Sequence, residues 1–112
     1  MTQEEILQGN KLIAKFIGMK YDSNANVYED DKNAYGLFSL KFHSSWDWLM
    51  PVVEKIENNL VNYSHEVVIF GEHCHINQGK THDMGYSSKG SKIASTWSAV
   101  VDFIKWYNTQ TK

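Results

Sequence analysis

Three histidines and one cysteine lie close together in the sequence, and these side chains are common zinc ligands. His73 and His75 are two positions apart in the sequence, so on a β-strand both project from the same face, while Cys74 points the other way. With His82 as a third ligand, and Asp83 beside it, they could hold a zinc ion. The spacing matches no standard zinc motif, so the alternative is a set of surface histidines on an edge strand.

A stretch rich in glycine and serine, residues 85–92, precedes the last predicted helix. Small residues let backbone N–H groups converge on an anion, and a helix N-terminus favours negative charge. The stretch is not a Walker A loop, because Ser91 separates Gly90 from Lys92. It is either a flexible connector or a small-nucleotide site with an aromatic ring stacked on the base. The candidate ligand-binding residues are Tyr86, Ser87, Ser88, Lys89, Ser91, Lys92 and Trp97.

Three large aromatic rings, Phe103, Trp106 and Tyr107, fall within a turn and a half near the C-terminus. This is more ring surface than a single core stripe requires, so part of it is a candidate interface with a partner or in a homo-oligomer. Ordinary core packing is the alternative interpretation, and we favour it.

Other chemistry finds little support in the sequence. Cys74 alternates with the two histidines on a strand, which indicates an apolar core cysteine rather than a nucleophile. The acidic run Glu29, Asp30 and Asp31 lacks the alternating oxygen ligands of an EF-hand, so we interpret it as a solvated loop and not a calcium site. No G-x-S-x-G elbow is present. We therefore favour a binding protein over an enzyme.

Composition bounds the class of protein. A chain of 112 residues with 42% hydrophobic content predicts one globular domain with a real core. Its single cysteine excludes an internal disulfide and fits a reducing cytoplasm. No targeting signal or membrane-spanning run is evident. The net charge is −2 and every basic residue is lysine, so sequence-specific DNA binding is not expected.

Three helices are predicted from apolar residues at helical spacing. The first begins with a capping box formed by Thr2 and Glu5 and ends at Gly18. The central helix, residues 44–60, is capped by Ser44 and contains Pro51, which should bend it or distort its first turn. The last helix covers about residues 91–107. Each helix has one apolar face, so the three together need a common apolar surface to pack against.

Strands are predicted between the helices. Residues 19–34 are interpreted as a long surface loop with room for a short strand at 27–28, and residues 35–42 as a strand. Residues 65–70 and 72–77 continue as extended chain, with Gly71 either a bulge or the turn of a hairpin. A bulge-free strand would place Val68, Phe70, Cys74 and Ile76 on one face. Residues 78–90 are interpreted as loop. The fold class is α+β, with a small, mainly antiparallel sheet of about three strands and three helices in the order α-β-α-β-β-α.

Two segments resemble small uncharacterised proteins of bacteriophages and prophages that are similar to the phage ABA-sandwich domain. They are F-H-S-S-W-D-W-L-M-P-V-V-E-K-I-E, residues 42–57, and K-I-A-S-T-W-S-A-V-V-D-F-I-K-W-Y-N, residues 92–108. Residues 8–14, Q-G-N-K-L-I-A, also look similar. The resemblance implies a compact α/β sandwich of phage origin, and it transfers no catalytic residue.

Three functional hypotheses follow from these patterns and this resemblance. The favoured one is a phage-encoded binding protein, cytoplasmic in the host cell, that antagonises a host system through protein interaction. The second is a sponge for a small or cyclic nucleotide at residues 85–92. The third is a metal-dependent enzyme at His73, His75 and His82.

Overall fold

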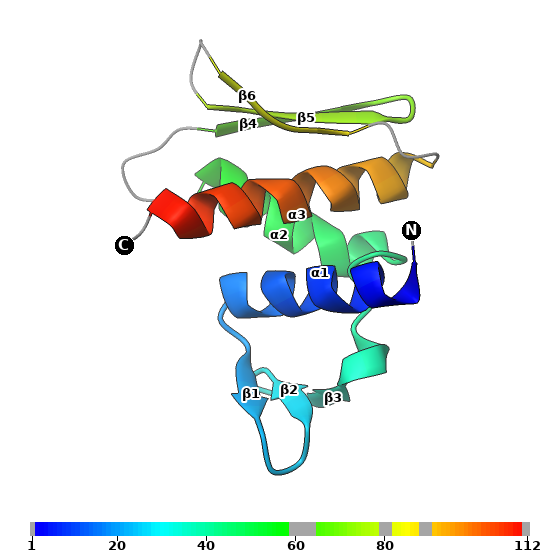
Figure 1. The fold of residues 1–112 in the computed structure, drawn as a ribbon, viewed down its shortest axis with the longest axis vertical. Helices are drawn as coiled ribbons and strands as arrows, with labels where there is room; N and C mark the ends of the chain where they lie inside the picture. Colours follow the sequence, from blue (N-terminus) through cyan, green and yellow to red (C-terminus); the bar gives the residue numbers. More distant parts are fainter. Residues whose placement is uncertain (1, 59–64, 79–81, 88–90, 111–112) are drawn as a thin grey trace.

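The computed structural model describes residues 2–58, 65–78, 82–87 and 91–110. Three helices lie between two three-stranded antiparallel sheets, β1-β2-β3 and β4-β5-β6 (Figure 1). The elements are α1 (Gln3–Phe16), β1 (Lys20–Asp22), β2 (Val27–Glu29), β3 (Ala34–Gly36), a 3-10 turn η1 (Leu37–Ser39), α2 (Trp46–Asn58), β4 (His65–Phe70), β5 (His73–Gln78), β6 (His82–Ser87) and α3 (Lys92–Gln110). Among these described residues, no helix has the length and apolar character needed to cross a bilayer.

The predicted α+β class, with three helices and a small antiparallel sheet, is confirmed. The predicted element order is wrong in two parts, because residues 82–87 add the strand β6, and residues 20–36 form a second sheet instead of a loop. Its strands have only three residues each, and polar turns separate them. A pattern this short contains too few apolar positions to show the alternation by which strands are recognised.

The first helix begins and ends as its sequence predicts. The Thr2 hydroxyl accepts from the Glu5 N–H, and the Glu5 carboxylate accepts from the Thr2 N–H, so both halves of the capping box are present. At the other end Gly18 has a φ of +88°, while its N–H donates to Lys15 and that of Met19 to Ala14. This is a Schellman ending, which glycine permits and which turns the chain away from α1 into β1.

Two similar four-residue turns build the β1-β2-β3 sheet. The Asp22 carboxylate accepts from the N–H groups of residues 24 and 25 in the first turn. In the second turn the Asp30 carboxylate accepts from those of residues 32 and 33. Strands of three residues and turns of four place Tyr21, Tyr28 and Tyr35 directly opposite one another. Opposite residues of neighbouring strands share a face, so the three tyrosines form a row across the sheet.

The strand predicted over residues 35–42 is wrong beyond β3. After Gly36 the chain forms η1, which leaves Phe38 74% exposed, while Leu40 and Phe42 are buried. The chain must turn here toward α2, and Ser45, not Ser44, is the residue immediately before that helix. A strand over this range would place Phe38, Leu40 and Phe42 on one face, whereas only Leu40 and Phe42 of the three are buried.

The β4-β5 pair is a hairpin, which confirms the alternative interpretation of Gly71. The φ of Gly71 is +54°, and Phe70 pairs directly with His73 across a two-residue turn. Pairing places Val67 and Ile69 on the face of Cys74 and Ile76, so the bulge-free face assignment for Val68 and Phe70 is wrong. Residues 82–87, predicted as loop, form β6, which pairs with β5.

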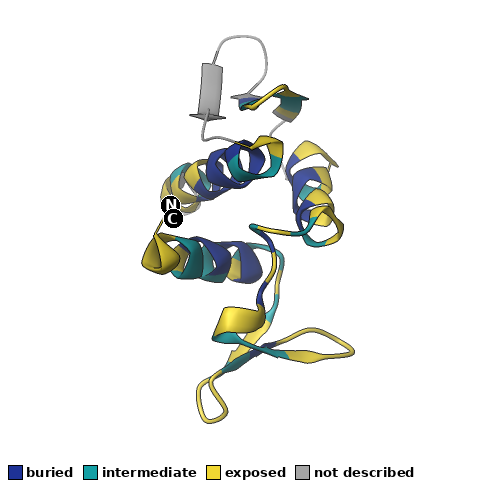
Figure 2. Ribbon diagram, turned by 90° about the vertical axis from the view of Figure 1, so that its right-hand side faces the viewer, coloured by how far each residue is buried: buried dark blue, intermediate teal, exposed yellow. Residues whose placement is uncertain are grey.

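The core lies between the helices and the inner face of the β4-β5-β6 sheet (Figure 2). Helix α3 is buried along most of its length and contacts β5, β6, α1 and α2. The Ser91 hydroxyl caps it by accepting from the Ala94 N–H, and Ser95 Oγ donates to the Glu72 carbonyl in the hairpin turn. Helix α3 is therefore the element against which α1, α2 and the β4-β5-β6 sheet pack.

A buried asparagine connects α1 to α3 and to the chain before α2. Asn10, 2% exposed, donates through Nδ2 to the Leu40 carbonyl (3.2 Å) and to His43 Nδ1 (3.0 Å). Its Oδ1 accepts from Trp97 Nε1 at 2.8 Å, which fixes the orientation of the amide. An amide nitrogen only donates, so Nδ1 of His43 carries no proton and accepts this hydrogen bond. One side chain thus orders three segments far apart in the sequence.

The residue before Asn10 permits this contact. A Cβ atom on Gly9 would lie 2.3 Å from Cζ2 of Trp97 and 3.0 Å from Cγ2 of Val101. The distance to Trp97 is sterically forbidden, so glycine is required for α1 to approach α3 closely enough for the Asn10 hydrogen bond.

Replacing Asn10 with alanine should lower the free energy of unfolding by about 2 to 4 kcal/mol, because it leaves the Trp97 N–H and the Leu40 carbonyl buried without partners. Urea denaturation measures this change. Asn58→Ala at the exposed end of α2 is the matched control and should change stability by less than about 0.5 kcal/mol. Equal effects of the two substitutions would refute the role given to Asn10.

The contact with His43 should make stability depend on pH. Burial lowers the pKa of His43 in the folded chain, whereas the unfolded chain keeps a pKa of about 6.5. Below that pH the unfolded chain is protonated at His43 while the folded chain is not. The free energy of unfolding therefore decreases as the pH is lowered, and it levels off below the pKa of the folded chain. The variant His43→Asn retains an acceptor and does not titrate. Denaturation between pH 5 and 8 should show a shallower slope for it than for the wild type, and equal slopes would contradict the assignment.

Candidate functional site

The zinc site proposed at His73, His75 and His82 stays a prediction, and the backbone places His82 away from the other two histidines. His73 and His75 lie on β5 and pack against Phe70, with ring centroids 5.3 and 5.5 Å from it. His82 pairs with Gln78, three positions beyond His75, which corresponds to about 10 Å along the strand. Within the described side chains, no group of three His, Cys, Asp or Glu residues is placed to hold a metal; the His82 and Asp83 side chains lie outside them.

The proposed nucleotide loop is only partly described. Residues 88–90, including Ser88 and Lys89, lie outside the described part, as do the side chains of Tyr86 and Ser87. Ser91 caps α3 and Lys92 is its exposed first residue. Trp97 is 4% exposed and its N–H is bonded to Asn10, so its ring is not open to a base.

The C-terminal aromatic residues serve packing within the chain. Phe103 is fully buried and contacts both Phe16 and Tyr107, with centroid distances of 6.5 and 5.9 Å. Trp106 and Tyr107 are half-buried, and Tyr107 also meets Phe16 edge to face at 5.7 Å. This arrangement joins α1 to α3, as the core interpretation expects, and a homo-oligomer stays a prediction.

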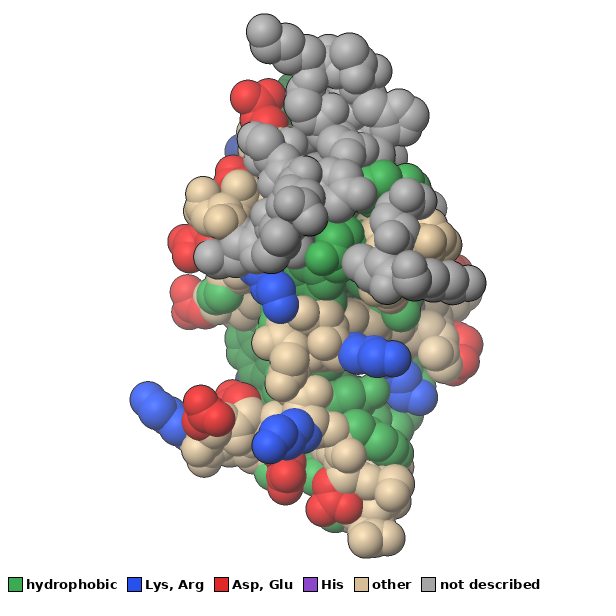
Figure 3. Space-filling view, turned by 90° about the vertical axis from the view of Figure 1, so that its left-hand side faces the viewer, with side chains coloured by type: hydrophobic (Ala, Val, Ile, Leu, Met, Phe, Trp, Pro, Cys, Tyr) green, Lys and Arg blue, Asp and Glu red, His purple; other side chains and the backbone are tan. Residues whose placement is uncertain are grey.

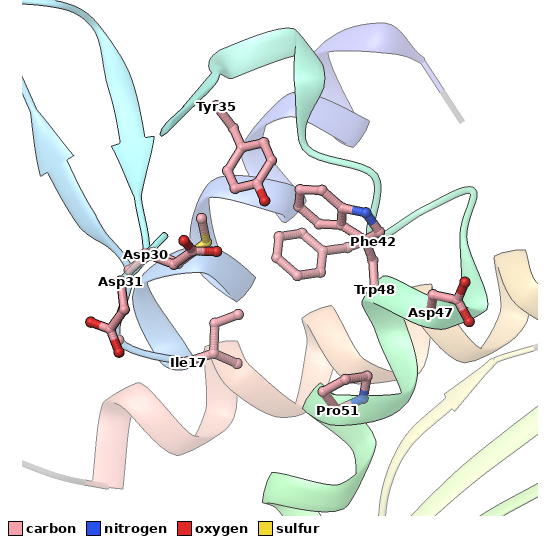
Figure 4. Close-up of a pocket in the computed structure, with 10 residues that line it drawn as sticks. Ile17, Asp30, Asp31, Tyr35, Phe42, Asp47, Trp48 and Pro51 are labelled. Carbon is pink, nitrogen blue, oxygen red and sulfur yellow. The ribbon is translucent and has the colours of Figure 1, made fainter. Parts of the chain in front are cut away.

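An open cavity of about 350 Å³ combines aromatic rings with carboxylates (Figure 4). It lies where the end of α1, the turn between β2 and β3, and the start of α2 meet. We call it the acid–aromatic pocket. It is lined by Ile17, Gly18, Met19, Asp30, Asp31, Tyr35, Phe42, Asp47, Trp48 and Pro51.

Three rings form one wall of the acid–aromatic pocket. Trp48 lies between the other two, with its centroid 4.9 Å from Tyr35 and 5.1 Å from Phe42, and both contacts are edge to face. Phe42 is buried beneath, while Tyr35 and Trp48 are half-buried and reach the cavity. Ring faces carry negative potential, so a cation held over one of these rings is attracted to it.

The carboxylates add to the same potential. The Asp30 side chain lies across from the rings, while those of Asp31 and Asp47 lie at the margins (Figure 4). Backbone N–H groups of Lys32 and Asn33 hold the pKa of Asp30 below its usual value, so this carboxylate stays charged at neutral pH. Pro51 has no N–H for the Asp47 carbonyl, which therefore lacks its helical donor at the pocket margin.

This pocket is not evident from the sequence, because its residues come from four separate segments. The sequence predicts a solvated loop at Asp30 and Asp31, and it places Trp48 in the central helix without indicating a cavity beside it. One signal was present: Tyr21, Tyr28 and Tyr35 recur every seven residues, and each of the first two is followed by polar turn residues. That repeat is what a meander of equal strands and turns produces.

Comparison with known proteins gives no family assignment: no family model, curated protein or solved structure matches this chain. The resemblance to phage proteins therefore stays an expectation from the sequence.

Cys74 should be chemically inert in the folded protein. Burial raises the pKa of its thiol to about 11, so only about one molecule in a thousand carries the thiolate at pH 8. A colorimetric disulfide reagent at pH 8 should label the native protein only at the rate of unfolding, and label it completely in 6 M guanidinium. Rapid native labelling would contradict this placement.

Proposed function

We propose that this protein acts by binding a partner protein, and that a basic side chain of the partner enters the acid–aromatic pocket. The observation that carries the proposal is the position of the Asp30 carboxylate opposite the Tyr35 and Trp48 rings. A lysine or arginine head group between them gains both an ion pair and a cation–π contact.

The chemistry of the pocket supports binding rather than catalysis. Asp30 has a lowered pKa and two backbone donors, so it is a poor general base at neutral pH. The single thiol of the chain, Cys74, lies on the other side of the helices in the sheet β4-β5-β6, and burial raises its pKa. An open, negatively charged cavity with a rigid aromatic wall suits recognition of a protruding cation.

The resemblance to phage proteins suggests the biological setting of this proposal. The partner would then be a host protein, and the chain would antagonise it by occupying a basic surface. This setting rests on residues 42–57 and 92–108, and the first of these segments supplies Phe42, Asp47, Trp48 and Pro51 to the pocket. The pocket itself does not depend on that origin.

Calorimetric titration with a nine-residue arginine-rich peptide, and with acidic and neutral peptides of equal length, tests the proposal. Only the basic peptide should bind. Asp30→Asn keeps an oxygen for the turn but removes the charge, and it should weaken binding at least about fivefold. Trp48→Leu should weaken it similarly, with thermal melting as the check on folding.

Asp22→Asn is the matched control, because Asp22 closes the first turn as Asp30 closes the second but does not line the pocket. It should leave the affinity for the basic peptide unchanged. Equal weakening by Asp22→Asn and Asp30→Asn would indicate general charge attraction and overturn the proposed site. Failure of the basic peptide to bind at all would do the same.

A further inference from the structure

A second cavity, of opposite character, lies between α1 and the β1-β2 hairpin. Its volume is about 470 Å³, within the range of small-molecule sites. The residues lining it that matter here are Lys11, Leu12 and Lys15 from α1, and Tyr21 and Tyr28 from the sheet. The lining includes two lysines and no aspartate or glutamate. We call it the lysine–tyrosine pocket.

Two ammonium groups share one side of the lysine–tyrosine pocket. Lys11 and Lys15 are four residues apart on α1, a spacing that stacks their side chains on the same face of the helix. Like charges at this spacing repel each other, so an anion between them relieves an unfavourable interaction. In a chain without arginine, a lysine pair is the available means of holding a phosphate.

An aromatic surface faces the same space. Tyr21 is 49% exposed, and its ring lies 5.0 Å from that of the buried Tyr28 at an angle of 47°. The Tyr21 hydroxyl donates to the Asn26 side chain, which fixes the ring. A positioned ring with one open side is a surface on which a planar base can stack, as in proteins that bind single-stranded nucleic acid.

We propose that the lysine–tyrosine pocket binds a nucleoside phosphate, with the base stacked on Tyr21 and the phosphate between Lys11 and Lys15. The excess of positive charge is confined to the pocket, because lysines and carboxylates are interspersed over the lower half of the face shown in Figure 3. The pocket is therefore distinguished by its lining and not by the overall charge of −2. The linings of the two pockets share one residue, Met19, and this proposal does not rest on the proposed function.

Calorimetric titration of the full chain with adenosine monophosphate at low salt tests this proposal, with adenosine and inorganic phosphate as separate probes. We expect a dissociation constant for adenosine monophosphate below about 1 mM, and at least tenfold weaker binding of each fragment. Tyr21→Leu should weaken nucleotide binding about tenfold, while Tyr21→Phe retains it.

Lys11→Gln with Lys15→Gln should also weaken binding at least about tenfold. The matched control is Lys32→Gln with Lys41→Gln, which changes the net charge equally at two exposed positions outside the pocket. No heat of binding with adenosine monophosphate, phosphate binding as tightly as the nucleotide, or equal loss in the two double variants would each overturn the proposal. Thermal melting of every variant verifies that it is folded.

Discussion

The side chain of Asn10 connects α1 to two segments that lie far from it in the sequence, α3 and the chain before α2. Its three hydrogen bonds reach α3, the carbonyl of Leu40 and the ring of His43. A buried amide is costly to leave unsatisfied, so α1 can pack only where all three partners are present. Gly9 supplies the space for that approach. The position of α1 in turn determines where the β1-β2-β3 sheet lies, since that sheet follows directly from its Schellman ending.

The tyrosine row of the β1-β2-β3 sheet links the two candidate sites. Tyr35 at one end contributes to the acid–aromatic pocket, and Tyr21 at the other end contributes to the lysine–tyrosine pocket. Tyr28 lies between them and is buried against the core, where burial raises the pKa of its hydroxyl. A small sheet of nine residues thus presents rings at both ends, while the charges beside each ring come from separate segments and have opposite sign.

The sequence predicted the helices well because their signals are local. The capping box at Thr2, the left-handed Gly18 and the apolar spacing of α3 are each contained within one or two turns. The β1-β2-β3 sheet was missed because Tyr21, Tyr28 and Tyr35 form a row only when the strands pair across the turns, and no single strand shows this pattern. The acid–aromatic pocket was missed for a similar reason: Asp30 and Trp48 are eighteen positions apart, and they come to one cavity only because Tyr35 of β3 packs against Trp48 of α2.

The most direct test of the proposed function is the NMR signal of the indole N–H groups. The chain has four tryptophans, and the structure gives two of them opposite roles. On titration with an arginine-rich peptide, the Trp48 indole signal should shift progressively, while that of Trp97, bonded to Asn10 in the interior, should stay unchanged. Shifts at Trp97 equal to those at Trp48, or no shift at Trp48 when the peptide binds, would contradict the acid–aromatic pocket as the binding site.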